Sequence, residues 1–167
     1  MSVVDDIAKV TEQEQRLTFK AFNEETAYEI GSTIRDLAKA DGVAVAIDIR
    51  FFNRPLFYFA MPGTNADNPD WLRRKGNCVR RWDRSSYLTA LRWKRDNRAV
   101  QPDHNIDPTE YAVHGGAFPI RIEGVGVVGS ITASGLPQRD DHAYVVRAIC
   151  KHLGIDAATL ALGPESA

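Results

Sequence analysis

The sequence has few cysteines, no long hydrophobic run and almost no net charge. Its two cysteines, Cys78 and Cys150, are too far apart for a metal or redox motif, and no disulfide framework is needed for a chain of this size. No stretch of about 18 consecutive apolar residues occurs, so we expect no membrane span. The formal net charge of −1 argues against a general polyanion-binding protein.

The N-terminal segment lacks the pattern of a secretory signal. It carries Asp5 and Asp6, and no basic stretch precedes an apolar run. We therefore expect a soluble, cytoplasmic protein with no membrane partner. The 167 residues, 44% hydrophobic and 26% charged, are sufficient for one globular domain over residues 1–167.

Hydrophobic periodicity and capping residues predict alternating helical and extended segments. Asn23 is a good N-cap for an amphipathic helix over 24–40, which Asp41 and Gly42 end. The other helices are predicted at 2–15, from Trp71, after Ser85 or Ser86, and from Pro137 to Gly154. Strands are predicted at 43–49 and 55–61, after a brief extended segment at 17–22, and between Tyr111 and Ser134 with a turn at Glu123–Gly124. This order predicts an α+β fold, an antiparallel sheet with helices packed on it.

Positive charge is concentrated in one segment. Between Trp71 and Arg98 the sequence has a net charge of +8, so the rest of the chain carries −9. On a helical wheel the arginines share one face, opposite an apolar face that only Lys75 interrupts. The arginines of this face are Arg73, Arg74, Arg80, Arg81 and Arg84.

The basic face has three interpretations. The first is a solvated helix face, and the second is a clamp whose guanidinium groups bind carboxylates or phosphates. The third, a groove for single-stranded nucleic acid, needs aromatic side chains among the arginines. Trp71 and Trp82 lie instead on the apolar side of the helix, so we do not expect a nucleic-acid partner.

The strand that ends at Ser134 has one ordinary core face and one hydroxyl-rich face. Ser130, Thr132 and Ser134 share the second face, which suits a closely packed helix, a subunit contact or a ligand. The glycines of residues 124–129 match the dinucleotide fingerprint G-x-G-x-x-G. That motif requires a helix to begin at the glycines, but here a strand pattern continues, so we reject a dinucleotide site.

His114 is the histidine whose surroundings most favour a function. Gly115 and Gly116 follow it at the start of a predicted strand and allow the backbone to approach a ligand closely. A plain turn that contains a histidine is the alternative. The four histidines form no i, i+4 pair, and we expect no metal site.

Two segments resemble the GlcG/HbpS-like haem-degrading-domain family. They are His114-Gly115-Gly116-Ala117-Phe118-Pro119-Ile120 and Gly129-Ser130-Ile131-Thr132-Ala133-Ser134-Gly135. Asp140 and Asp141 then supply the acidic start of the next helix. Asn68 to Lys75 and Arg84 to Tyr87 resemble an uncharacterised branch of the family with a His-Gly-Gly motif. The resemblance covers a core from about residue 16 to 153, and it leaves the N-terminal helix and a C-terminal tail outside.

The resemblance implies a profilin-like fold with about five antiparallel strands flanked by helices. It also implies a homo-oligomer and, for some members, binding of haem or a related tetrapyrrole. The implied ligand site joins His114, Gly115 and Gly116 to the hydroxyl face of Ser130, Thr132 and Ser134. Its anion partners would be Arg73, Arg74, Arg80 and Arg81.

The leading hypothesis is an oligomeric protein that binds haem or another small anionic ligand, with His114 as the haem ligand or as a general acid/base. The second is an enzyme that acts on a small carboxylated or phosphorylated substrate, with a histidine acid/base and an arginine clamp. The third is a purely structural oligomer. The sequence alone leaves open the ligand, the number of subunits, catalytic turnover and the direction in which the basic helix points.

Overall fold

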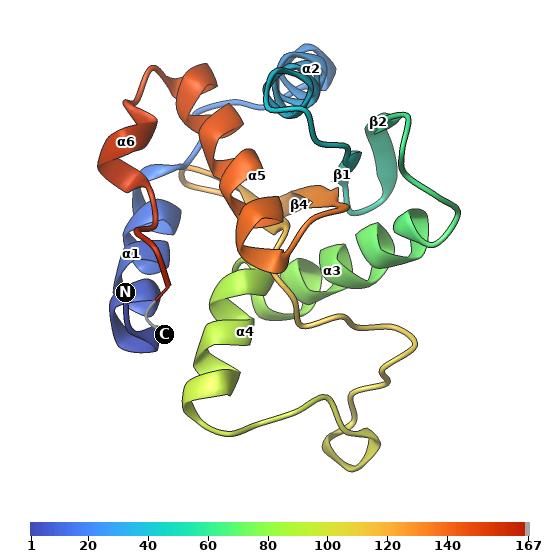
Figure 1. Ribbon diagram of the computed structural model, residues 1–167, viewed down its shortest axis with the longest axis vertical. Coiled ribbons are helices and arrows are strands. Elements are labelled where there is room, and N and C mark those ends of the chain that lie inside the picture. The colour runs from blue at the N-terminus through green and yellow to red at the C-terminus, as the bar shows by residue number, and fades with distance from the viewer. Residues whose placement is uncertain (166–167) are drawn as a thin grey trace.

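A computed structural model describes residues 1–165 of the chain. Its centre is a four-stranded antiparallel sheet in the order β2-β1-β4-β3 (Figure 1). The strands are β1 (Ala46–Phe51), β2 (Arg54–Ala60), β3 (Ala117–Ile122) and β4 (Gly126–Ser134). The helices are α1 (Val3–Arg16), α2 (Glu24–Ala40), α3 (Asn68–Trp82), α4 (Ser86–Arg95), α5 (Gln138–Leu153) and α6 (Ala157–Leu160), with a 3-10 turn η1 (Pro102–His104). The α+β class and the antiparallel sheet are confirmed.

The two faces of the sheet are covered differently. Helices α2 and α5 pack together on one face, where Ile30, Ile34 and Ile149 join Ile47 and Ile131 in the main hydrophobic core. Helix α3 lies across the other face over β4, β3 and β1. The hydroxyl-rich face of β4 therefore packs against a helix of its own chain.

Local sequence explains the best-defined elements. The Asn23 side chain accepts the Thr26 N–H at the start of α2, and such a cap stabilises a helix by about 1 kcal/mol. Ser85 caps α4 in the same way by accepting the Leu88 N–H. Gly154 ends α5 with a φ of +70°, in the left-handed conformation that glycine adopts readily.

The sheet differs from the expectation of about five strands. The extended segment at Leu17–Phe22 forms only an isolated bridge between Phe19 and Ile122. The strand expected from Tyr111 begins at Ala117, because the chain turns at Gly116, whose φ is +135°. The short helix α6 has no counterpart in the expected pattern.

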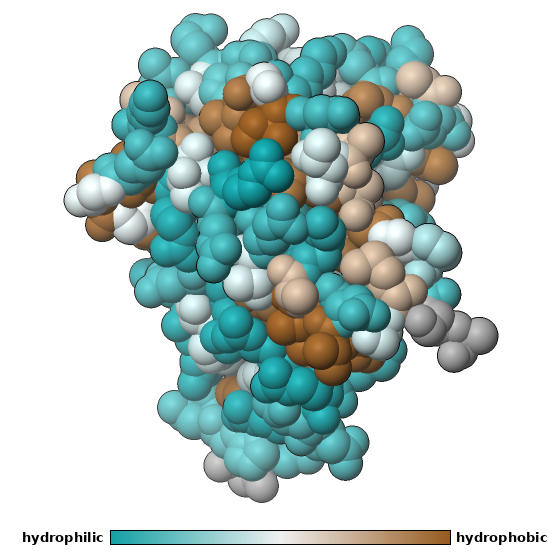
Figure 2. Space-filling view, turned by 90° about the vertical axis from the view of Figure 1, so that its left-hand side faces the viewer, coloured by the Kyte–Doolittle hydropathy of each residue, from teal (hydrophilic) through white to brown (hydrophobic). Residues whose placement is uncertain are grey.

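The two ends of the described chain lie beside each other (Figure 1). Helix α1 packs on α4, where Val10 contacts a cluster that includes Tyr87, Leu88 and Leu91. Figure 2 shows the face that α1 and α6 present, where hydrophobic patches are separated by hydrophilic residues. Within residues 1–165, no helix combines the length and the apolar character needed to cross a membrane.

Candidate functional site

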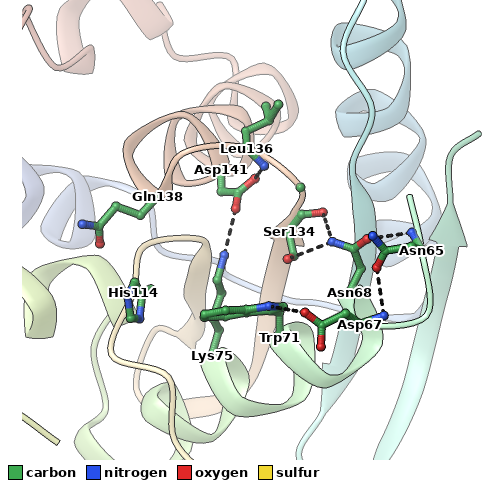
Figure 3. Close-up of a pocket in the computed structure, with 11 residues that line it drawn as sticks. Asn65, Asp67, Asn68, Trp71, Lys75, His114, Ser134, Leu136, Gln138 and Asp141 are labelled. Carbon is green, nitrogen blue, oxygen red and sulfur yellow. Dashed lines mark hydrogen bonds and ion pairs between the residues drawn. The ribbon is translucent and has the colours of Figure 1, made fainter. Parts of the chain in front are cut away.

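A polar pocket of about 280 Å³ opens where the start of α3, the end of β4 and the start of α5 meet (Figure 3). Asn65, Asp67 and Asn68 line one side, and His114 and Gln138 line the other. Lys75 and Asp141 lie at its base. We call the pocket and His114 together the His114 site.

Lys75 and Asp141 form a buried ion pair. The Lys75 Nζ donates to Asp141 Oδ2 at 2.8 Å and to the Ala133 carbonyl at 3.3 Å. The two side chains are only 4% and 1% exposed. Burial disfavours both charges, so it lowers the pKa of Lys75 and raises the pKa of Asp141, although each ion stabilises the other. Burying the two charges costs desolvation free energy. Each charge is tolerated in the interior only because the opposite charge lies beside it.

Backbone groups of the surrounding fold stabilise the Asp141 carboxylate. Asp141 lies in the first turn of α5, where the helix dipole favours a carboxylate, and its Oδ1 accepts the Leu136 N–H at 3.0 Å. Lys75 reaches it from the buried side of α3. The interruption of the apolar face by a lysine, together with the acidic start of the last helix, was the sequence signal for this pair.

His114 forms part of the pocket wall and is partly exposed. Its ring meets the edge of the Trp71 ring at a centroid distance of 5.4 Å. Burial, followed by the positive charges of Lys75 and Arg74, lowers the pKa of His114 below its ordinary value of 6.5. This lowering favours the neutral form of the imidazole near pH 7, and no side-chain hydrogen bond engages the ring within the described part of the chain.

Trp71 is held in place by two contacts on α3 and the loop before it. Its Nε1–H donates to Asp67 Oδ2 at 2.9 Å, and the Arg74 guanidinium lies 4.4 Å from the centre of its ring. Arg74 also donates to Asp70 at 2.7 Å. A flat aromatic wall is thus fixed beside His114 before any ligand arrives.

Gly115 and Gly116 are required by close packing. A Cβ on Gly116 would lie 2.5 Å from the Ala133 carbonyl oxygen and 2.8 Å from Lys75 Nζ. A Cβ on Gly115 would lie 2.3 Å from the Gln138 carbonyl oxygen. The Gly115 N–H donates to the Gln138 side chain at 3.1 Å, so the glycines position the backbone that carries His114.

A second, more apolar hollow of about 400 Å³ lies beyond His114. His114 and Gln138 line both hollows. Tyr87, Leu91, Trp93, Val100 and Val113 supply apolar wall, Lys94 and Arg98 supply positive charge, and Glu165 supplies one negative charge. His114 and Gln138 thus lie between the polar pocket and a second hollow that is partly apolar.

The structure brings only some of the sequence-predicted residues together. Ser134 lines the polar pocket with His114, whereas Ser130 and Thr132 are buried, and their hydroxyls lie 3.4 and 3.9 Å from the Cβ position of Gly76 on α3. The backbone of Gly115 and Gly116 leads from His114 into β3. Only one end of the hydroxyl-rich face, at Ser134, therefore lies in the same pocket as His114.

The predicted arginine clamp is divided. Arg74 lies near the pocket, behind Trp71, and Arg73 is exposed and paired with Asp70 and Glu110. Arg80 and Arg81 lie at the other end of α3 and line neither hollow, and Arg81 donates to the Asn105 carbonyl. Within residues 1–165 with described side chains, no group of three metal-ligating side chains is brought together.

Comparisons with known proteins place the chain among relatives of similar length. It is 49% identical to the UPF0303 protein mlr5144 of Mesorhizobium japonicum, over 99% of each chain, and 46% identical to a UPF0303 protein of Paraburkholderia phymatum, over 97% of this chain and 98% of the other. Among solved structures, Ybr137w matches with a TM-score of 0.80 and 28% identity, over 89% of this chain and 87% of the other.

Two further solved structures share the fold at lower identity. HbpS matches with a TM-score of 0.63 and 22% identity over 84% of this chain and 96% of the other, and a PduOC:heme complex with 0.66 and 14% over 78% and 94%. The family described as haem degrading protein HbpS-like matches residues 22–150. Assignment to a His-Gly-Gly branch of that family stays a prediction. The chain belongs to the HbpS-like family.

Proposed function

We propose that the protein binds a small anionic ligand, haem or a related tetrapyrrole, at the His114 site. The observation that carries the proposal is the position of His114, a neutral imidazole between a polar pocket and an apolar hollow. Neutral histidine is a common axial ligand of haem iron. The family description and the haem complex of PduOC support the choice of haem among anionic ligands.

The two hollows suit the two parts of a tetrapyrrole. Tyr87, Leu91 and Trp93 offer an apolar wall for a macrocycle, and the volume of about 400 Å³ falls in the range of roughly 300–1,000 Å³ typical of ligand sites. Lys94 and Arg98 lie where they can pair with propionates. In this arrangement the arginines of the sequence-predicted clamp, Arg73, Arg80 and Arg81, are not the propionate partners.

A haemin titration followed by Soret absorption tests the proposal. We expect saturable binding near one haemin per chain with a histidine-ligated spectrum, and we expect His114→Ala to lose that spectrum and at least tenfold in affinity. His104→Ala is the matched control, because His104 is exposed in η1 and lines neither hollow. Unsaturable binding, or equal spectra for the two variants, would contradict the proposal.

We also propose that the protein acts as a homo-oligomer in the cytoplasm. Strand β2 is an edge strand on which Tyr58 is 49% and Phe59 is 39% exposed, and such an edge favours association with a second copy. Both cysteines are buried free thiols, which suits a reducing compartment. Light scattering of purified protein tests the assembly, and Tyr58→Lys should shift it toward the monomer.

An enzyme is the second candidate function, favoured by the Lys75–Asp141 pair beside His114. A carboxylate or phosphate substrate in the polar pocket would meet a neutral histidine able to accept a proton. Screening small carboxylates and sugar phosphates for turnover, with His114→Gln alongside, tests this candidate. Ligand binding without any His114-dependent turnover would leave the binding protein as the function.

A further inference from the structure

A third hollow of about 420 Å³ lies away from His114, beyond the C-terminal end of α3. Three arginines from three different segments line it: Arg84 after α3, Arg92 on α4 and Arg121 on β3. All three side chains are partly buried. We call this feature the arginine hollow.

The arginines of the hollow are unusual in lacking counter-ions. Nine of the fifteen arginines in the chain lie within 4.0 Å of a carboxylate. The other six have no carboxylate within that distance among the described side chains, and all of them fall between residues 80 and 121. They are Arg80, Arg81, Arg84, Arg92, Arg98 and Arg121. Among the described side chains, arginines without a carboxylate partner are therefore confined to residues 80–121.

Internal hydrogen bonds use only part of the donor capacity in the hollow. Arg84 donates its Nε–H to Thr89 at 3.1 Å, and Arg121 donates one Nη2–H to the Asp83 carbonyl at 2.6 Å. No hydrogen bond engages the Arg92 guanidinium within the described residues. Each guanidinium has five N–H donors, so most of them stay available to a ligand.

The arginines also disfavour one another. Burial lowers the pKa of Arg84, and the nearby charges of Arg92 and Arg98 lower it further, against an opposing effect of Glu14. Half-buried like charges without counter-ions raise the energy of the unliganded protein. An anion in the hollow would remove that cost.

The two carboxylates in the hollow do not fill this role. Glu14 is buried and its Oε1 accepts the Ser85 N–H at 2.8 Å; burial raises its pKa, although that hydrogen bond and the charges of Arg121 and Arg84 act in the opposite direction. Asp83 is the exposed C-cap residue of α3, with a left-handed backbone conformation, and it forms no ion pair with a described side chain. Glu14 instead fixes the start of α4, which carries Arg92.

We propose that the arginine hollow binds the phosphate groups of a small phosphorylated molecule, at a site distinct from the His114 site. Guanidinium groups bind phosphate oxygens in pairs, which gives both affinity and orientation. Leu88 and Trp82 line the same hollow and offer apolar surface to the remainder of such a molecule. The proposal does not depend on haem binding, because the two sites share no lining residue.

Calorimetric titration of the full chain with pyrophosphate tests the inference. We expect one saturable site, weakened about tenfold or more in Arg92→Gln, since the variant loses charge-assisted hydrogen bonds to phosphate oxygens. Arg92 is the appropriate position because no internal hydrogen bond is lost with it. Arg35→Gln is the matched control, since Arg35 is an α2 arginine paired with Asp36. Its affinity should stay within about twofold of the wild-type value, a change of roughly 0.4 kcal/mol.

Several outcomes would overturn the inference. They are the absence of saturable binding, equal losses in Arg92→Gln and Arg35→Gln, and loss of pyrophosphate binding in His114→Ala. Tight binding of a single-stranded oligonucleotide that depends on Arg80 and Arg81, without a pyrophosphate site, would identify a nucleic-acid surface instead. Retention of pyrophosphate binding by His114→Ala would support two separate sites, whatever that variant does to haemin.

Discussion

At the N-terminal end of α3 the basic side chains are neutralised within the fold, whereas beyond its C-terminal end they are not. Arg73, Arg74 and Lys75 pair with Glu110, Asp70 and Asp141, respectively. Arg80 and Arg84 have no carboxylate within 4.0 Å among the described side chains. The basic segment thus has two parts. The first forms ion pairs that help to build the His114 site, and the second has positive side chains that are not paired with a carboxylate among the described residues.

The difference separates two uses of positive charge. Near His114, Lys75 links α3 to the first turn of α5 through its ion pair with Asp141, and its charge lowers the pKa of the imidazole. In the arginine hollow, Arg92 and Arg98 repel the charge of Arg84, Glu14 opposes this only in part, and no carboxylate among the described side chains forms an ion pair with these arginines. Removing a basic side chain near the N-terminal end of α3 is therefore expected to lower the free energy of unfolding of the protein. Removing one from the arginine hollow is not expected to lower it.

Removing the charge of Lys75 should produce the largest effect. Lys75→Met leaves Asp141 buried without its partner, so the free energy of unfolding in urea should fall by about 3–5 kcal/mol. Replacing both partners, Lys75→Met with Asp141→Leu, should recover part of the loss. Arg73→Met, at an exposed pair on the same helix, should cost no more than about 1 kcal/mol. Similar losses for Lys75→Met and Arg73→Met would contradict the structural role of the buried pair.

Crowding the backbone at the His114 site should give the next largest effect. Gly116→Ala combines an unfavourable φ with a Cβ that overlaps the Ala133 carbonyl, so it should destabilise the fold by about 2–4 kcal/mol. Gly124→Ala is the control, because its φ of +76° is also positive but no heavy atom lies near its Cβ position. That control should cost about 1 kcal/mol. Thermal unfolding of both variants measures the difference, and equal losses would show that the close packing is not important.

Removing single arginines from the two regions should give small effects of opposite sign. Arg73→Gln removes an ion pair and should lower stability slightly, whereas Arg92→Gln removes repulsion and should raise it slightly. Both changes should stay within about 0.5 kcal/mol. Urea unfolding at low ionic strength is the measurement, because salt screens both effects. A clear loss of stability in Arg92→Gln would mean that Arg92 has an internal partner.

The smallest expected effect is a shift in the titration of His114. Its pKa lies below 6.5, so the stability gained from the neutral ring is complete above pH 6.5 and is lost as the pH falls through the lowered value. Arg74→Gln removes one cause and should raise the pKa of His114 toward 6.5. Arg73→Gln should leave it unchanged. Nuclear magnetic resonance titration of the His114 ring measures both, and a downward shift in Arg74→Gln would contradict the assigned cause.

The sequence was sufficient for most of the fold because its signals are local. Asn23, Gly42 and Gly154 mark helix ends by capping chemistry, and the α2 boundaries agree with the expected helix over 24–40. The sheet has four strands where about five were expected, because a count taken from a resemblance cannot show that Phe19 forms only an isolated bridge. Whether an extended segment joins a sheet depends on contacts distant in sequence.

The site was only partly predictable for the same reason. His114 and its two glycines stand together in the sequence, but Lys75 and Asp141 are 66 residues apart and meet only because the fold brings the first turn of α5 close to α3 at the end of β4. A helical wheel placed the arginines of α3 on one face. It could not show that Arg73 has carboxylate partners or that Arg84 and Arg121 meet in one hollow.

The central claim is that the molecule has two anion-binding regions. The most direct test is to map the binding sites of two ligands on the same protein. Amide resonances would be followed during titration with zinc protoporphyrin, a diamagnetic tetrapyrrole, and separately with pyrophosphate. We expect the porphyrin to shift residues around Leu91, Trp93 and His114, and pyrophosphate to shift residues around Arg84, Arg92 and Arg121. Shifts from both ligands at one common set of residues, or shifts spread over the whole surface, would contradict the account.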